Sequence, residues 1–90
     1  MVKGKTQSGF NVEINEKRME DIRFFELLDD METNPLRLPK LVEYMLGKEQ
    51  KEKLYAHLEK DGIVNAADVT KEMESIFHLV SEASEKAKNS

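Results

Sequence analysis

The chain of 90 residues contains no cysteine and no tryptophan, and it has only two prolines, two histidines and four glycines. The lack of cysteine excludes disulfide bonds and thiolate metal sites. A chain this short buries only a modest core, and small domains often gain stability from disulfides, metal ions or association. Association is the remaining source of extra stability, and five methionines and four phenylalanines are compatible with it.

The sequence also lacks a basic cluster and a long apolar run. Its net charge is -4 and its pI about 5.2, and Lys48, Lys51 and Lys53 are interleaved with glutamates. A nucleic-acid binder normally presents a basic face, so we expect no direct nucleic-acid binding. No apolar run approaches the ~20 residues of a membrane span, and the start MVKGKTQSG resembles no signal peptide. We therefore expect no membrane association and a cytosolic location.

Apolar spacing and turn residues predict a mainly α fold. Phe10, Val12 and Ile14 alternate with polar residues, which is typical of one short strand. Gly47 and Gly62 each follow an apolar helical pattern, where glycine commonly ends a helix. We predict a small four-helix domain with one short N-terminal strand, and the expected helices are residues 16–32, 35–46, 48–60 and 66–83. Residues 1–90 form one domain, with a flexible arm at 1–8 and a frayed tail at 84–90.

The predicted core is the set of apolar residues that share the inward faces of these helices. It comprises Ile22, Phe25, Leu28, Leu41, Leu54, Leu58, Met73, Ile76 and Val80.

The sequence contains no convincing catalytic constellation or metal site. His57 lies on a polar helix and His78 opposite the apolar stripe of the last helix, and neither has a nucleophile nearby in the sequence. Placing Gly62 at position six of a calcium-binding loop gives Asp61 at position five and Asp68 at position twelve. Histidine in the first position and aspartate in the last suit calcium poorly. A degenerate calcium-binding module is therefore kept as a third interpretation, and we expect no enzyme activity, metal or cofactor.

Helix 16–32 carries apolar residues on two arcs, of which one exceeds what a single core face needs. Phe24, Leu27 and Met31 form this second arc, and Tyr44 lies off the stripe of the next helix. Methionine and aromatic residues suit a tolerant apolar binding surface. We therefore predict that these four residues bind other proteins, with burial of the helix on two sides as the equal alternative.

The order of segments resembles the small tail assembly chaperones of long-tailed bacteriophages and prophages. The resemblance runs from Phe10 to Ser90, through FNVEI, FFELLDDME, NPLRLPKLVEYMLG, KEQKEKLYAHLEKDG and IVNAADVTKEMESIF. Its most specific parts are the LGKEQ junction and the segment LYAHLEKDG.

This resemblance implies a non-enzymatic protein of the host bacterial cytoplasm. Such chaperones coat the tape measure protein, keep it soluble, help recruit tail tube subunits, and are absent from the mature virion. The partners implied are the tape measure protein, further copies of the chain and, through a longer frameshift product, the tail tube protein. The alternative from the residues alone is a generic helical adaptor or regulator from a mobile element.

The last residues fit the programmed frameshift that the resemblance implies. Ala87-Lys88-Asn89 can be encoded by GCA AAA AAC, which contains the slippery heptamer A AAA AAC. The alternative is that these residues are only a polar terminus.

Overall fold

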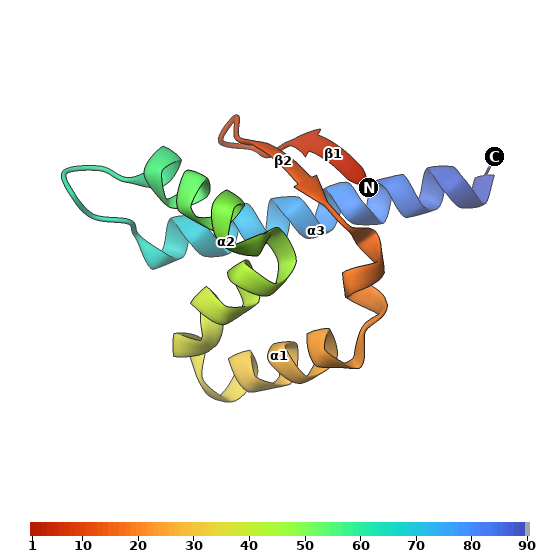
Figure 1. Ribbon diagram of the computed structural model, residues 1–90, viewed down its shortest axis with the longest axis horizontal. Coiled ribbons are helices and arrows are strands. Elements are labelled where there is room, and N and C mark those ends of the chain that lie inside the picture. The colour runs from red at the N-terminus through yellow and green to blue at the C-terminus, as the bar shows by residue number, and fades with distance from the viewer. Residues whose placement is uncertain (90) are drawn as a thin grey trace.

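The computed structural model describes the backbone of residues 1–89 and the side chains of residues 1–83. Two strands open the chain and helices follow (Figure 1). The elements are β1 (Val2–Lys5), β2 (Asn11–Ile14), the 3-10 helix η1 (Glu16–Glu20), α1 (Ile22–Thr33), the 3-10 helix η2 (Pro35–Arg37), α2 (Leu38–Leu58) and α3 (Ala66–Asn89). The mainly α class is confirmed, but there are three α-helices and not four.

The segment expected to be a flexible arm supplies a second strand. The predicted strand around Val12 and Ile14 is present as β2, but it is not alone, because β1 pairs antiparallel with it from Val2 opposite Ile14 to Lys5 opposite Asn11. The turn is closed by a bond from the Thr6 N–H to the Phe10 carbonyl (2.9 Å), and the tight turn uses Gly9 at a φ of 89°. The short β1 carries too few apolar residues for its sequence pattern to reveal a strand.

The helix predicted at residues 48–60 is not a separate element but the second half of α2. Gly47 has φ 82° and ψ 162°, a conformation open essentially only to glycine, and the helix bends there and then continues to Leu58. The stop predicted at Gly47 is therefore a kink. The predicted break between α1 and α2 is confirmed, because the Asn34 side chain accepts a bond from the Leu36 N–H at the start of η2.

The connection between α2 and α3 is a tight turn at Asp61 and Gly62. Both residues have positive φ, 54° and 79°, and Lys60 and Ile63 exchange two backbone hydrogen bonds. Positive φ at both central residues is the geometry that an Asp-Gly pair favours. Asn65 then caps α3 by accepting a bond from the Ala67 N–H (2.8 Å), as the sequence predicts.

One core joins the hairpin to the helices. Val12 and Ile14 of β2 pack with the inward faces of α2 and α3, and Gly4 lies close enough to Leu79 that a Cβ there would stand 3.1 Å from its methyl groups. The buried apolar residues are Val12, Ile14, Phe24, Leu38, Leu41, Val42, Met45, Leu46, Leu54, Leu58, Val69, Met73, Ile76 and Val80.

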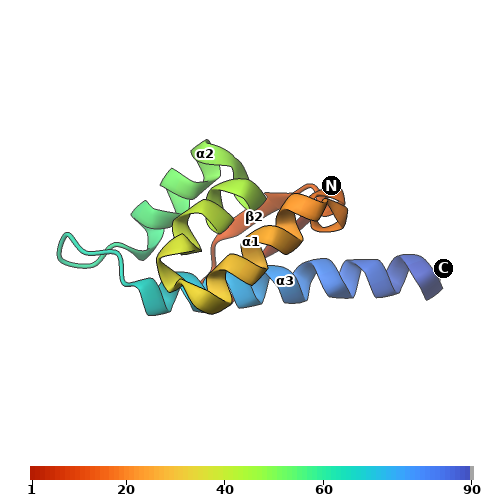
Figure 2. The ribbon, with the colours of Figure 1, turned by 90° about the horizontal axis from the view of Figure 1, so that it is seen from below.

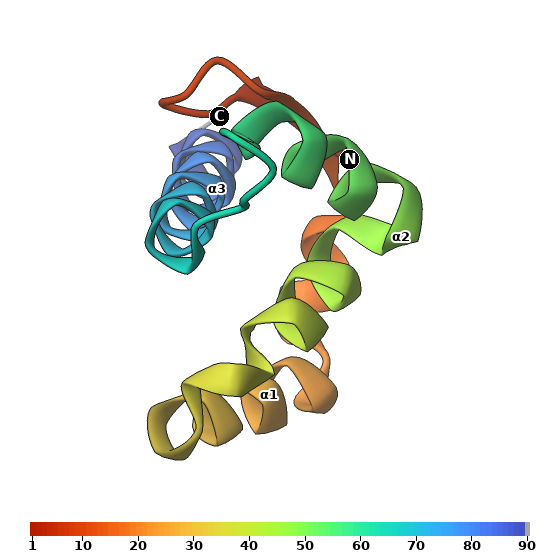
Figure 3. The same ribbon diagram turned by 90° about the vertical axis from the view of Figure 1, so that its left-hand side faces the viewer.

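The molecule is elongated along α3. Its extents are 45 × 29 × 19 Å and its radius of gyration is 13.2 Å, whereas a compact 90-residue domain has about 12 Å. Viewed from below, α3 runs along most of the length of the molecule, and the turn that joins it to α2 projects beyond its start (Figure 2). Viewed along α3, the hairpin lies at one end of the molecule and α1 at the other, with α2 between them (Figure 3). α3 extends as a helix to Asn89, beyond the Ala83 at which fraying was expected.

Candidate protein-binding surface and polar pockets

The outer side of α1 exposes two large apolar side chains. Ile22 is 64% exposed and Phe25 51% exposed, and since they lie three residues apart on a helix they face the same side. Both were predicted to be core residues, and this prediction is wrong. Leu28, the third predicted core residue of α1, is partly buried, and Leu36 of η2 is 84% exposed. We call Ile22, Phe25 and Leu36 the α1–η2 surface.

The arc predicted to bind partners is the one that α1 turns inward. Phe24 is 4% exposed and packs edge-on against Phe77 of α3, with ring centroids 5.8 Å apart. Leu27 and Met31 are partly buried against the same core. The structure thus brings the three residues together on one side of α1, where Phe24 is not accessible to a partner. Periodicity identified both arcs but could not say which one faces the core.

Tyr44 links α2 to the start of α1 through its hydroxyl. It donates to Asp21 Oδ2 (2.7 Å), while Arg18 donates to the Tyr44 carbonyl (3.0 Å) and stacks on its ring. The Tyr44 hydroxyl and the Arg23 backbone N–H lower the pKa of Asp21. Desolvation, and then the Asp21 carboxylate, raise the pKa of Tyr44. The Tyr44 hydroxyl therefore makes an internal contact, and no pattern in the sequence indicates this cluster.

An open pocket of about 560 Å³ lies between η1 and α3. Met19, Val80 and Ala83 supply apolar surface and Glu20 supplies negative charge beside it, while Glu16 pairs with the N-terminal ammonium group of Met1 at 3.1 Å. Along the sequence, η1 is followed closely by Ile22, a residue of the α1–η2 surface. An apolar side chain flanked by basic residues has the chemistry that fits such a pocket.

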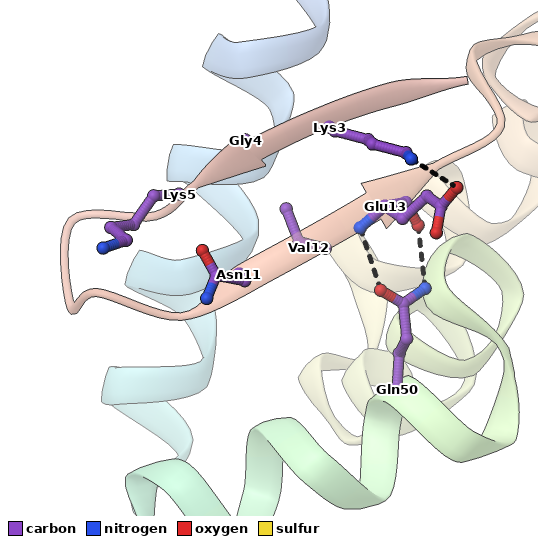
Figure 4. A pocket seen from close by; sticks show the side chains of 7 residues that line it. All are labelled: Lys3, Gly4, Lys5, Asn11, Val12, Glu13 and Gln50. Atoms are coloured by element: carbon purple, nitrogen blue, oxygen red, sulfur yellow. Dashed lines mark hydrogen bonds and ion pairs between the residues drawn. The ribbon is translucent and has the colours of Figure 1, made fainter.

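A second pocket lies on the outer side of the hairpin (Figure 4). The Gln50 side chain accepts from the Glu13 N–H (2.9 Å) and donates to the Glu13 carbonyl (2.8 Å), so its amide takes the place of a neighbouring strand. Lys3 forms an ion pair with the Glu13 carboxylate at 3.8 Å. The lining side chains of β1 and β2 are exposed apart from Val12, and the bonds of Gln50 protect the edge of β2.

The nearest approach to a catalytic pair is Ser8 with His57. Nε2 of His57 lies 3.1 Å from the Ser8 hydroxyl and 3.1 Å from the Ser8 carbonyl oxygen. A carbonyl only accepts, so the contact of Nε2 with the Ser8 carbonyl is a hydrogen bond in the tautomer that carries its proton on Nε2, and in that tautomer Nε2 is no base toward the hydroxyl. His57 therefore fastens the hairpin turn to α2, and Phe10 packs on its ring. His78 is exposed and pairs with Glu82 at 2.8 Å.

The turn at Asp61 and Gly62, whose sequence partly matches a calcium-binding loop, is held by the two backbone hydrogen bonds between Lys60 and Ile63. Among the residues whose side chains the structure describes, no three histidine or acidic side chains gather into a group that could hold a metal ion. In the same part of the chain, no helix combines the length and apolar character needed to cross a membrane.

Comparisons with known protein families, curated proteins and solved structures found no significant match to this chain.

Proposed function

We propose that this protein is a tail assembly chaperone that binds apolar helical segments of a phage tape measure protein. The observation that carries the proposal is the α1–η2 surface, where Ile22, Phe25 and Leu36 are exposed although each is large and apolar. The resemblance in the order of sequence segments from Phe10 to Ser90 supports the proposed family, and the surface offers a physical means of binding.

The charges around this surface support a weak and reversible contact. α1 carries Arg23 and four acidic residues, and all four acidic residues, Glu26, Asp29, Asp30 and Glu32, are exposed. A partner helix with apolar residues and flanking lysines or arginines would match this surface. The three apolar residues are few, so each copy would bind modestly and many copies would be needed to cover a long partner. The same surface is a candidate for contact between copies.

The test is co-expression with the product of a neighbouring tape measure gene. We expect the protein to raise the soluble fraction of the tape measure protein, and the double variant Ile22→Ser with Phe25→Ser to lose this effect. Both positions are exposed, so the variant should fold normally, which circular dichroism can check.

Ile63→Ser is the matched control. Ile63 is 67% exposed, but it lies in the turn between α2 and α3, away from the α1–η2 surface. The control should keep the solubilising effect. Equal rescue by the wild type and the double variant would rule out the α1–η2 surface, and no rescue by the wild type would rule out the chaperone function.

A further inference from the structure

A buried carboxylate lies where the hairpin turn, the end of α2 and the start of α3 meet. Glu72 of α3 is 3% exposed, between the core residues Val69 and Met73. Its Oε2 is buried and has no hydrogen-bond partner among the described residues. Most buried carboxylates accept hydrogen bonds or pair with a cation, because desolvating an unpaired charge is costly. Glu72 is therefore an acceptor that the fold leaves without a partner.

Glu72 lines a pocket of about 450 Å³. Ser8 of the hairpin turn, His57 of α2 and Asp68 of α3 also line it. The contacts of His57 with Ser8, and the Phe10 ring at 5.5 Å from the imidazole, hold the wall between α2 and the hairpin in place. The pocket thus has a preformed wall and a desolvated anionic group.

The pocket is lined by two lysines as well as two acidic residues, and neither lysine neutralises Glu72. Lys60 and Lys71 line the rim, but both are exposed, and within the described part of the chain no ion pair joins either of them to Glu72. Their charge is screened by water, whereas Oε2 of Glu72 has almost no surface in contact with water. Asp68 at the rim adds a second acceptor.

We propose that the Glu72 pocket binds the guanidinium group of an arginine side chain supplied by another protein. A guanidinium is planar and carries five N–H donors, so one group can bond Glu72 and reach Asp68 at the same time. It is also less strongly hydrated than an ammonium group and is cheaper to bury. The proposal concerns a different face from the α1–η2 surface and does not rest on the proposed function.

Direct binding is tested by adding Nα-acetyl-arginine N-methylamide to the ¹⁵N-labelled full chain at low ionic strength. We expect saturable amide shifts around Ser8, His57 and Glu72. Glu72→Gln keeps the shape of the side chain and should weaken binding about tenfold or more. Glu74→Gln removes an exposed charge from the same helix and should leave binding unchanged. Absence of saturable shifts, or equal binding by Glu72→Gln, would overturn the proposal, and equal binding of n-butylammonium would overturn the choice of guanidinium.

Thermal unfolding supplies an independent readout. An unpartnered buried carboxylate destabilises the free protein, so Glu72→Met should raise the Tm by about 4 °C or more. A lower Tm for this variant would mean that the carboxylate is already satisfied in the free protein. Sedimentation distinguishes the source of the arginine, since weaker self-association in Glu72→Gln would assign it to a second copy and overturn its assignment to another protein.

Discussion

At the scale of single residues, α3 packs against the core through one stripe of buried apolar side chains. Met73, Ile76 and Val80 were expected to be buried, and all three are. Their 3-4 spacing belongs to a helix with one apolar stripe, so periodicity alone decides which residues face inward. Because these side chains are buried as predicted, the free energy of unfolding that is lost when one of them is shortened can be estimated.

Ile76→Ala should lower the free energy of unfolding by about 2–5 kcal/mol, the usual result of leaving a cavity at a fully buried isoleucine. Ile76 has no exposed surface, whereas Ile63 is 67% exposed. Ile63→Ala is therefore the matched control and should change stability very little. Urea unfolding measures both, and similar losses in the two variants would contradict the packing described for α3.

Tyr44→Phe tests the contact that fastens α2 to the start of α1. The Tyr44 hydroxyl is the first cause of the lowered Asp21 pKa, so its removal should move that pKa up toward the ordinary 3.8. The N–H of Arg23 still donates, so a part of the lowering should remain. Carbon-detected NMR titration of the Asp21 carboxyl measures the change.

The same contact gives stability a defined pH dependence. A carboxyl whose pKa is lowered by folding stabilises the protein above its unfolded pKa, and this contribution is lost as the pH falls through the lower folded value. Tyr44→Phe should therefore lose less stability than the wild type as the pH falls below about 4. An identical acid transition, with an unchanged Asp21 titration, would show that the hydroxyl does not hold the carboxylate.

At the scale of elements, the sequence located the positions where helices are interrupted, but it did not predict the course of the backbone at each position. Gly47 and Gly62 were both expected to end helices. Gly62 does follow a helix end, within the turn to α3, but at Gly47 the chain bends and resumes helical geometry at once. A positive φ is compatible with either outcome, and the choice depends on the tertiary contacts of the following turn, such as the bonds of Gln50 to β2.

α1 illustrates a second limit of pattern reading. A helix with apolar residues on two arcs gives no internal reason to bury one rather than the other. The packing of Phe24 on Phe77 decides it, and this contact joins residues 53 positions apart in the chain. For the same reason the sequence could not show that Phe24 would be buried and that the exposed apolar residues of this helix would be Ile22 and Phe25.

Gln50→Ala tests whether α2 protects the edge of β2. The alternation of an antiparallel pair directs the Glu13 backbone away from β1, and its N–H bonds the Gln50 side chain. The variant should speed hydrogen exchange of the Glu13 amide about tenfold, which corresponds to the loss of a typical hydrogen bond. The Val12 amide, on the side facing β1, should change much less.

Glu49→Ala is the control for this experiment. Glu49 precedes Gln50 in α2 and pairs with the exposed Lys53 at 3.2 Å. Since alanine favours helix at both positions, neither variant should weaken α2 through propensity. Equal exchange rates of the Glu13 amide in the wild type and Gln50→Ala would show that the edge is protected in another way.

At the scale of the whole molecule, α3 separates two regions with different properties. Its first half lies in the core under α2 and the hairpin, and its far end lies away from α1 and α2 (Figure 1). A domain added after Ser90 would therefore begin at the far end of α3, without displacing the core residues of the described fold. This geometry is compatible with the longer frameshift product that the resemblance implies.

We predict a minor product that begins with this chain and continues in the overlapping reading frame after Lys88. The codons of Ala87, Lys88 and Asn89 can form the heptamer A AAA AAC, on which two tRNAs can slip back one base and pair again. Mass spectrometry of infected or induced cells should find peptides that cross from Lys88 into the new frame. Synonymous codons that remove the heptamer should abolish the longer product. They leave the amino-acid sequence of this chain unchanged, so its fold is the same with either set of codons. A gene whose natural codons at Lys88 and Asn89 cannot slip would exclude this frameshift site, and the tail tube partner would then need another route to the complex.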